Sequence, residues 1–406
     1  MKEKILYFFK ACIHIADRIL LFLLPKTLYY HLFPRGSLFL TMKIHRLQTR
    51  GNFIQLSPLH SNDAIPYYRV AYFNGCPDGR SDRYRVYDQV RFLTANNVLA
   101  DVYSYGSIDE LEASNLYDCL VLFRCANGIE SQMRRILYRY HAANAPVFYD
   151  VDDYLLERCT NDERYAVAET IRCCDRMTVS TKYLADLYYS AFHIPVDVIP
   201  ITISEIQYDY AQAILKQRQG NNLITGKVRI VYLCGSNSHD RDFLVASDAL
   251  FHILLQHPEA ELVLVGPLKV PKIFKRVKKQ VVRVKYMPYL KLLEFTATAN
   301  INIAPLTNEV FNLGKSETKI TEAALLKVPT IASPIYSYEQ LITSGVNGII
   351  AKTSQEWYEA LERLISDKVF RQQMGEQAHK DFVNMYTLQN VGKKIIDLQL
   401  RAMHEN

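Results

Sequence analysis

The residues with the clearest chemical potential lie between positions 311 and 333, where a glycine and two lysines surround the start of an amphipathic segment. The spacing predicts a helix over 317–327 that follows Gly314 and Lys315. A helix N-terminus offers free backbone N–H groups and the positive end of the helix dipole. Lys315 and Lys319 add two ammonium groups, so this turn is suited to binding a diphosphate.

Three further polar residues belong to the same turn and helix. The spacing makes Ser316 the N-cap and places Glu317 in the first turn. Glu322 lies one turn beyond Lys319 on the same face, where a carboxylate could accept hydrogen bonds from two neighbouring hydroxyls, such as those of a ribose. Taken alone, the stretch is equally compatible with an ordinary capped helix whose charges are solvated.

A second cluster of charges is acidic and follows a predicted strand. Asp150, Asp152 and Asp153 end one apolar run, and Arg124 ends the run before it. The carboxyl ends of parallel strands meet along one edge of a sheet, so we expect these carboxylates at a cleft edge, with Arg124 able to pair with one of them. Three interpretations remain open: a divalent-metal site, an acidic cluster that contacts substrate, or a structural role in which one aspartate caps the next helix.

Strand-like and helix-like segments that alternate along most of the chain must position these residues. The predicted strands cover 68–73, 100–105, 119–123, 146–151, 177–180 and 196–199, and then 228–234, 261–265, 281–286, 301–305, 329–333 and 348–351. Amphipathic segments separate most of them, which predicts βαβ units and mostly parallel sheets. The polar stretch 202–227 interrupts the alternation and is interpreted as a linker between two doubly wound domains. Such domains place a ligand cleft between them.

The charge of the chain is concentrated in two basic regions. The 406 residues carry a formal net charge of +6, yet residues 1–50 contain nine Lys or Arg against two acids, and 269–285 contain eight basic residues and no acid. The remainder is therefore mildly acidic, which favours steering towards an anionic surface over nucleic-acid binding. The 8 cysteines show no metal-ligand spacing and are expected to be free thiols.

The N-terminal segment is apolar but interrupted by charge. Residues 5–24 contain Lys10, Asp17 and Arg18, and Pro25 follows them. A spanning helix needs about 20 largely uncharged residues. Helical spacing instead favours an amphipathic helix that lies in the membrane surface, although a helix packed on the protein's own core is the alternative.

Five separate elements resemble the donor half of the glycosyltransferase family 4 enzymes, which are retaining GT-B transferases that use nucleotide sugars. These elements are 303–306, 315–316, 322–323, 328–333 and 345–350. Upstream, the stretch 233–243 is similar to a Gly-Ser/Thr-x-Thr/Ser-His-x-x-Asp-Phe loop of bacterial surface-polysaccharide, rhamnan-type transferases. The resemblance covers roughly residues 67–367.

The resemblance implies particular roles for the polar residues of the donor half. The family's ribose-binding glutamate corresponds to Glu322. A second glutamate usually stands eight positions earlier, where this chain has Gly314, so Glu317 or the backbone of the 312–316 turn would have to contact the donor sugar. The usual basic diphosphate ligands after the first strand of this domain are also replaced, and the nearest side chains are His239 and Arg241.

The resemblance also assigns the amino-terminal half. The loop that contains Gly75 matches the family's flexible loop near the donor phosphates, and an acidic motif like Asp150–Asp153 recurs in the same polysaccharide subgroup, which favours this interpretation over the metal site of a GT-A transferase. The expected catalytic residues are Asp152, Asp153 and His239, and the expected donor-binding residues are Gly75, Gly235, Ser236, Arg241, Gly314, Lys315, Ser316, Glu317, Lys319 and Glu322.

The expected fold is therefore α/β and GT-B: two Rossmann-like doubly wound domains that face a cleft, preceded by an N-terminal amphipathic helical extension. The expected divisions are membrane-associating helices over 1–45, an acceptor-side domain over 46–201, a linker over 202–227, a nucleotide-sugar-binding domain over 228–367, and C-terminal helices over 368–406.

The expected function is retaining transfer of a hexosyl or deoxyhexosyl group from a nucleotide sugar to a lipid-linked or polysaccharide acceptor in bacterial cell-surface glycan synthesis. We expect no cofactor and no required metal, because cationic side chains would stabilise the leaving diphosphate. The expected partners are the nucleotide sugar, the acceptor and an anionic membrane surface, without nucleic acid, at the cytoplasmic face of the plasma membrane. The alternatives are a nucleotide-sugar 2-epimerase and a non-catalytic GT-B scaffold, the latter suggested by Gly314.

Overall fold

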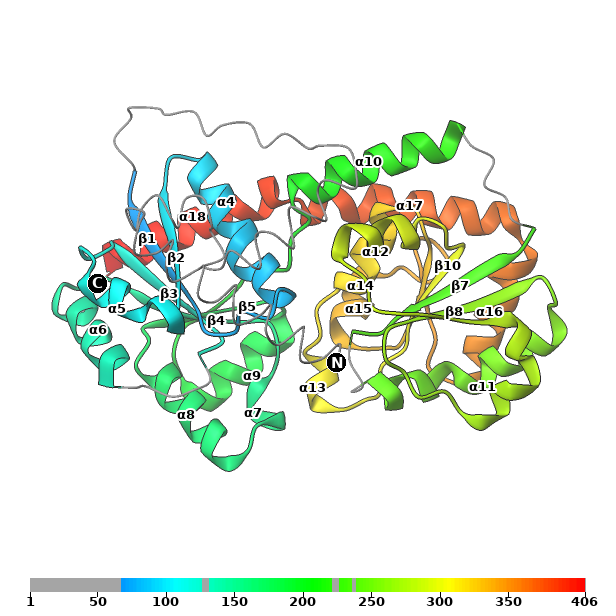
Figure 1. Cartoon of the computed structure of the whole chain (residues 1–406), viewed down its shortest axis with the longest axis horizontal. Helices are drawn as coiled ribbons and strands as arrows, with labels where there is room; N and C mark the ends of the chain where they lie inside the picture. Colours follow the sequence, from blue (N-terminus) through cyan, green and yellow to red (C-terminus); the bar gives the residue numbers. More distant parts are fainter. Residues whose placement is uncertain (1–66, 126–130, 221–225, 236–238, 406) are drawn as a thin grey trace, which may run out of the picture.

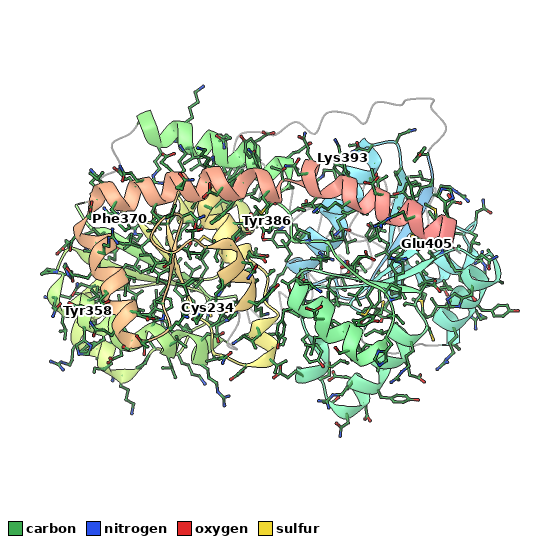
Figure 2. The ribbon with its side chains drawn as sticks, turned by 180° about the vertical axis from the view of Figure 1, so that it is seen from behind. Cys234, Tyr358, Phe370, Tyr386, Lys393 and Glu405 are labelled. Carbon is green, nitrogen blue, oxygen red and sulfur yellow. The ribbon has the colours of Figure 1, made fainter. Side chains whose placement is uncertain are left out.

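The computed structural model describes residues 67–125, 131–220, 226–235 and 239–405. Two α/β domains lie side by side along the long axis of the molecule, and two long helices run across the back of both (Figures 1 and 2). Each domain contains one sheet of six strands, and the neighbouring strands of both sheets are parallel. The α/β class and the two doubly wound domains predicted from the sequence are confirmed.

The amino-terminal domain is built on a sheet with the order β2-β1-β3-β4-β5-β6. Its strands are β1 (Arg69–Asn74), β2 (Leu99–Ser104), β3 (Cys119–Phe123), β4 (Val147–Val151), β5 (Arg176–Val179) and β6 (Val196–Val198), and its helices are α4 (Asp88–Ala95), α5 (Ile108–Ala113), α6 (Ser131–Ala142), α7 (Leu155–Arg158), α8 (Asn161–Arg172) and α9 (Lys182–Phe192). The strands β3 and β4 are buried throughout, as their apolar sequences require. The direction of winding changes between β1 and β3, so ligand-binding loops are expected after these two strands.

The carboxyl-terminal domain has the strand order β12-β11-β10-β7-β8-β9. Its strands are β7 (Val228–Leu233), β8 (Ala260–Val265), β9 (Val281–Val284), β10 (Ile301–Ala304), β11 (Thr330–Ala332) and β12 (Ile349–Ile350), and its helices are α11 (Asp240–Gln256), α12 (Tyr289–Thr296), α13 (Val310–Leu313), α14 (Thr318–Leu325), α15 (Tyr336–Leu341) and α16 (Ser354–Ser366). Here the winding changes between β7 and β10. The loops after these strands contain Gly235 and the 305–317 segment, and both include residues of the site predicted from the sequence.

The chain crosses between the domains twice, and the two crossings are hydrogen-bonded to each other. Ile203 donates its N–H to the carbonyl of Tyr386 at 2.7 Å and accepts one from the N–H of Leu388 at 3.0 Å. The second crossing joins α17 (Lys368–Tyr386), which packs on the carboxyl-terminal domain, to α18 (Leu388–Glu405), which returns to the amino-terminal domain (Figure 2). These two crossings form the covalent connection between the domains.

Two features differ from the sequence-based expectation. The presumed linker contains the helix α10 (Glu205–Gly220), whose apolar side packs against α12 through Ala211, Tyr210 and Ile214. The helix predicted over 317–327 with Ser316 as its N-cap begins instead at Thr318, so the N-cap residue is Glu317, which makes no side-chain cap hydrogen bond. The predicted extension over 1–45 lies outside the described residues.

Candidate functional site

The first turn of α14 brings two buried ionisable groups to the carboxyl-terminal side of the cleft. Neither Lys319 Nζ nor Glu317 Oε2 has a hydrogen-bond partner among the described residues. Burial lowers the pKa of Lys319 to about 8 and raises the pKa of Glu317 to about 7. Lys319 Nζ lies 4.9 Å from the ring centroid of Tyr232. An ammonium group without a hydrogen-bond acceptor, at the positive end of a helix, is suited to binding an anionic ligand.

A buried aspartate organises the loop that leads to this turn. Asp242 Oδ1 accepts hydrogen bonds from the Thr307 N–H at 2.9 Å and from Asn312 Nδ2 at 2.8 Å. Its other oxygen lies 2.8 Å from Nδ1 of His239. Burial acts to raise the pKa of Asp242, but these hydrogen bonds outweigh it and hold the pKa below its usual range. Asp242 therefore fixes both the 305–313 loop and the orientation of His239.

Glu322 lies at the point where the two domains meet. This carboxylate is 9% exposed and accepts a hydrogen bond from the hydroxyl of Tyr84 in the amino-terminal domain. Nη2 of Arg83 is 3.7 Å from the same carboxylate oxygen, and Tyr289 stacks on the guanidinium from the carboxyl-terminal side. Burial raises the pKa of Glu322, although the cation and the hydroxyl oppose this shift. The contact joins residues 238 positions apart in the sequence.

The amino-terminal side of the cleft carries a network of paired charges. Arg124, which has a left-handed φ of 45°, donates from Nε to Asp152 at 2.6 Å and from Nη2 to Asp153 at 2.5 Å. Lys315 reaches across the cleft and donates to Asp153 at 2.6 Å. The predicted pairing of Arg124 with this cluster is confirmed, and it involves two carboxylates. The helix α7 has Tyr154 as its N-cap residue without a side-chain cap, so the capping role for an aspartate is wrong.

The two carboxylates of this network have different proton affinities. Burial would raise the pKa of Asp153, but Lys315 and Arg124 outweigh burial and hold the pKa well below its usual range. Burial dominates at Asp152 and raises its pKa. A pair of neighbouring carboxyl groups whose pKa values are pushed apart is a common arrangement for acid–base chemistry.

Asp150, the third aspartate of the motif, has a structural environment. It forms a bidentate pair with Arg85, at 2.9 and 2.5 Å, and also accepts a hydrogen bond from Thr178. Arg85 is completely buried. This fully paired group lies beneath the cleft surface and holds the segment that carries Arg83 and Tyr84.

Two glycines of the expected site lie close to neighbouring groups, Gly75 to backbone atoms and Gly314 to a leucine side chain. A Cβ at Gly75 would lie 2.8 Å from the Cα of Cys125, because the loop after β1 packs against the end of β3. A Cβ at Gly314 would lie 2.7 Å from Cδ2 of Leu184, and the Gly314 carbonyl accepts a hydrogen bond from Thr181. A side chain at the position where the family resemblance implies a glutamate would therefore require Leu184 of the opposite domain to move.

The remaining expected residues lie in three different environments. The side chain of Arg241 is 81% exposed and is 3.6 Å from Glu309. The carbonyl of Gly235 accepts a hydrogen bond from Arg80 at 3.4 Å. The hydroxyl of Ser316 bonds to that of Thr318 at 2.9 Å, and Ser236 lies outside the described residues.

The structure adds three side chains that the sequence reasoning did not assign: Arg83, Tyr289 and Asp242. Asp242 stands in the quoted 233–243 motif and could have been selected as a buried partner of His239, three positions earlier on the same helix face. Arg83 lies in the segment after the Gly75 loop, but nothing in the sequence indicates that it contacts Tyr289. Only the meeting of the domains creates that contact.

The described residues contain neither a metal-ligand cluster nor a membrane-spanning helix. Among the described residues there is no cluster of three or more His, Cys, Asp or Glu side chains arranged to hold a metal ion. In the described segments, no helix has the length and apolarity needed to cross a bilayer.

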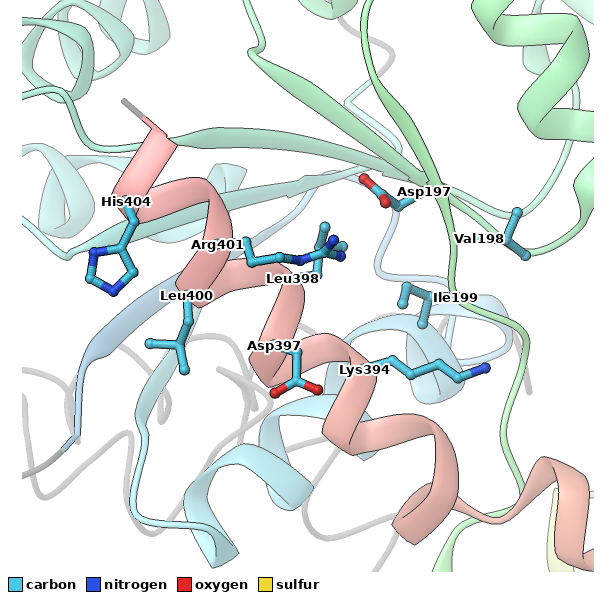
Figure 3. Close-up of a pocket in the computed structure, with 9 residues that line it drawn as sticks. All are labelled: Asp197, Val198, Ile199, Lys394, Asp397, Leu398, Leu400, Arg401 and His404. Atoms are coloured by element: carbon cyan, nitrogen blue, oxygen red, sulfur yellow. The ribbon is translucent and has the colours of Figure 1, made fainter.

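A groove of about 680 Å³ lies outside the cleft, between β6 and α18 (Figure 3). Its walls combine apolar residues such as Ile199 and Leu398 with both acidic and basic side chains, including Asp397 and Arg401. None of the residues that line it belongs to the cluster around Glu322 or Asp153.

Comparison with known proteins relates this geometry to a class of enzymes. Residues 228–367, which contain Lys319 and Glu322, match the family described as glycosyl transferases group 1. No curated protein matches the chain in sequence.

Solved structures extend the likeness to both domains. Anabaena HepE, crystallised with UDP and glucose, is similar with a TM-score of 0.62 at 13% identity, over 82% of this chain and 99% of that one. A glycosyltransferase from Rickettsia africae gives 0.61 at 13% identity, over 84% and 99%, and sucrose-phosphate synthase from Thermosynechococcus elongatus gives 0.59 at 12%, over 84% and 100%. The expected GT-B fold is confirmed, and the site described above lies between its two domains.

Proposed function

We propose that the protein is a retaining glycosyltransferase that moves a hexosyl or deoxyhexosyl group from a nucleotide sugar to a lipid-linked or polysaccharide acceptor. The observation that carries this proposal is Lys319, whose Nζ is buried without a hydrogen-bond partner among the described residues, one turn from the buried Glu322 in the segment that matches glycosyl transferases group 1. Crystal structures of the fold relative HepE contain UDP and UDP-glucose, which supports a nucleotide sugar as the donor. A membership in family 4 and in its rhamnan-type subgroup is part of the proposal.

The donor would lie along the first turn of α14. Glu322 would accept hydrogen bonds from the ribose, while Lys315, Lys319 and the free N–H groups of the helix start would bind the diphosphate. Glu317 and the neighbouring backbone would lie near the sugar, because Gly314 offers no side chain. Negative charge grows on the diphosphate as it departs, and cations fixed before the reaction stabilise that charge most effectively.

Retention would follow a front-face route. The bond between the anomeric carbon and the diphosphate oxygen breaks, the acceptor oxygen bonds to the same face, and the acceptor proton passes to the departing phosphate. Asp152 and Asp153 would orient the acceptor hydroxyl from the opposite wall, with Arg124 fixing their positions. His239, held by Asp242, would lie on the diphosphate side.

The cationic site would make a divalent metal unnecessary. The test is transfer measured after removal of metal ions with EDTA, with manganese or magnesium added back. Full activity in EDTA would support the proposal. Loss of activity that manganese restores would instead assign the aspartate cluster to a metal.

The membrane would be reached through the basic 269–285 region together with the amphipathic N-terminal segment, at the cytoplasmic face. Within this region a 3₁₀ segment, Lys272–Gln280, buries Phe274 and Val277 while Ile273 remains 45% exposed. An exposed apolar side chain among lysines suits an anionic bilayer surface, where each basic residue contributes about 1 kcal/mol. Flotation with anionic and with neutral vesicles at low and high salt measures this contribution.

The decisive experiment separates transfer from its two alternatives. The purified protein is incubated with UDP, GDP and dTDP sugars, with and without a lipid-linked acceptor fraction, and the products are analysed by mass spectrometry and NMR. Transfer or donor hydrolysis excludes a scaffold, for which Gly314 in place of the family's usual glutamate is the argument. Interconversion of epimers without acceptor would identify a 2-epimerase instead.

A further inference from the structure

The nucleoside half of the candidate donor site is already filled by side chains of the opposite domain. The hydroxyl of Tyr84 donates to Oε1 of Glu322, and Nη2 of Arg83 lies 3.7 Å from the same oxygen. The guanidinium carbon of Arg83 is 3.8 Å from the ring centroid of Tyr84 and 3.3 Å from that of Tyr289. The carboxylate assigned to the ribose is thereby both covered and engaged.

The chemistry of these two side chains matches that of the proposed ligand. A hydroxyl on a carboxylate is the interaction that a ribose would make with Glu322. A planar guanidinium over an aromatic ring occupies the face on which a nucleobase would stack, and here that face belongs to Tyr289. Arg83 and Tyr84 therefore stand in for a ribose hydroxyl and a base.

The backbone that carries the pair has an unusual local structure between two fixed points. Arg83 begins a π-helical turn, Arg83–Tyr87. This conformation is rare in proteins overall, but where it occurs it is often at a functional site. On one side Asn74 Nδ2 donates to Asp82 at 3.2 Å, and on the other Arg85 is paired with Asp150. Because both anchors lie within the amino-terminal domain, Arg83 and Tyr84 can leave Glu322 by side-chain rotation or domain separation while the turn stays in place.

We propose that Arg83 and Tyr84 form a gate that closes the nucleoside site until a donor displaces it. The inference rests on the proposed function and adds a regulatory step to it. A nucleotide sugar must compete with an internal occupant, so the affinity and the association rate are both reduced by the fraction of time that the gate is shut. The same displacement breaks a contact between the domains and so links donor entry to their relative movement.

The test is nucleotide binding by the Tyr84→Phe variant of the full-length protein. This substitution keeps the ring and removes only the hydroxyl that engages Glu322. Isothermal titration with UDP, GDP and dTDP should show about tenfold tighter binding of the preferred nucleotide than in the wild type, the change expected when one hydrogen bond to a charged group is lost from the competitor. Stopped-flow measurements should place the gain in the association rate. Tyr165→Phe, a matched loss of a hydroxyl from a ring 64% exposed on α8, should change neither quantity.

The other outcomes discriminate between the gate and the function on which it rests. Binding by Tyr84→Phe without binding by the wild type would support the gate strongly. Weaker or unchanged binding by Tyr84→Phe, with the wild type binding normally, would overturn the gate and leave the donor site intact. Failure of both proteins to bind any of the three nucleotides would overturn the donor site and the gate together.

Discussion

The two walls of the cleft treat buried charge in opposite ways. On the amino-terminal wall Arg124 pairs with both Asp152 and Asp153. On the carboxyl-terminal wall Lys319 Nζ and Glu317 Oε2 have no hydrogen-bond partner among the described residues. A paired buried charge fixes geometry, whereas an unpaired one costs stability and retains binding capacity. The network of Arg124, Asp152 and Asp153 is therefore a rigid template that fixes the geometry of the amino-terminal wall. The carboxyl-terminal wall retains the capacity to bind an anionic ligand.

Breaking the template should produce the largest loss of stability. We expect Arg124→Met to lower the free energy of unfolding by about 3–5 kcal/mol, because it leaves the carboxylate of Asp152 buried without its cation. Chemical denaturation measured by circular dichroism provides the value. The substitution Arg134→Met removes an exposed arginine from α6 and serves as the control. A loss of less than 1 kcal/mol would show that the template is not held by this pair.

The opposite wall should respond in activity while its stability is preserved. We expect Lys319→Met to reduce the transfer rate about 100- to 1000-fold, the typical cost of removing one preorganised group that stabilises developing negative charge. Burial disfavours the ammonium form of Lys319, so its removal should leave the melting temperature unchanged or higher. An active Lys319→Met enzyme would contradict the diphosphate assignment, and a markedly destabilised one would contradict the contrast between the walls.

The unpaired carboxyl group of the same wall predicts a specific dependence of stability on pH. The pKa of Glu317 is raised from its ordinary 4.5 to about 7, so the folded state holds this proton more tightly than the unfolded chain does. The resulting stabilisation, about 3 kcal/mol, is fully present below pH 4.5 and is lost as the pH rises to 7. Glu317→Gln should remove this component. Unfolding measured at pH 5 and pH 8 should therefore show a smaller difference for the variant, and equal differences would refute the assignment.

The smallest effect concerns the residue at which the two walls touch. In the Tyr84→Phe background, which lacks the competing hydroxyl, Glu322→Ala should weaken nucleotide binding about tenfold to a hundredfold, because a hydrogen bond to a charged group contributes roughly 1.5–3 kcal/mol. The variant should remain folded, and Glu322→Gln should lose less because it still accepts a hydrogen bond. Titration calorimetry with UDP, GDP and dTDP measures the change. Unaltered affinity in a folded variant would remove the ribose role from Glu322.

The sequence predicts features that depend on a single segment, but it does not predict those that depend on contacts between distant segments. The strands, the order of the domains and the pairing of Arg124 with the acidic motif follow from local patterns, because each depends on the periodicity or the end of a single strand. The helix α10 was missed because its polar composition resembles a linker, while its narrow apolar face is stabilised by α12. The contact between Tyr84 and Glu322 depends on how two separately folded sheets meet, which no local pattern encodes.

Ser316 illustrates a smaller limit of the same kind. A serine before an amphipathic segment predicts an N-cap. In the structure the helix begins at Thr318, and the hydroxyl of Ser316 forms a hydrogen bond with the hydroxyl of Thr318 instead of capping the helix. Directly before this turn, Lys315 is held by Asp153 on the opposite wall, a contact that the local sequence does not indicate.

The return of α18 to the amino-terminal domain has a consequence for how the protein is made. Residues of this last helix, among them Val391, Ile395 and Leu398, complete the same apolar cluster as Tyr68 and Val70 at the start of the domain. The hydroxyl of Tyr68 donates to Gln399 at 2.6 Å. The amino-terminal domain is synthesised before α18, so it exposes part of its core until α18 has been made. During synthesis the carboxyl-terminal domain can complete its fold before its predecessor does, and a truncated messenger would yield a product that chaperones and proteases recognise as unfinished.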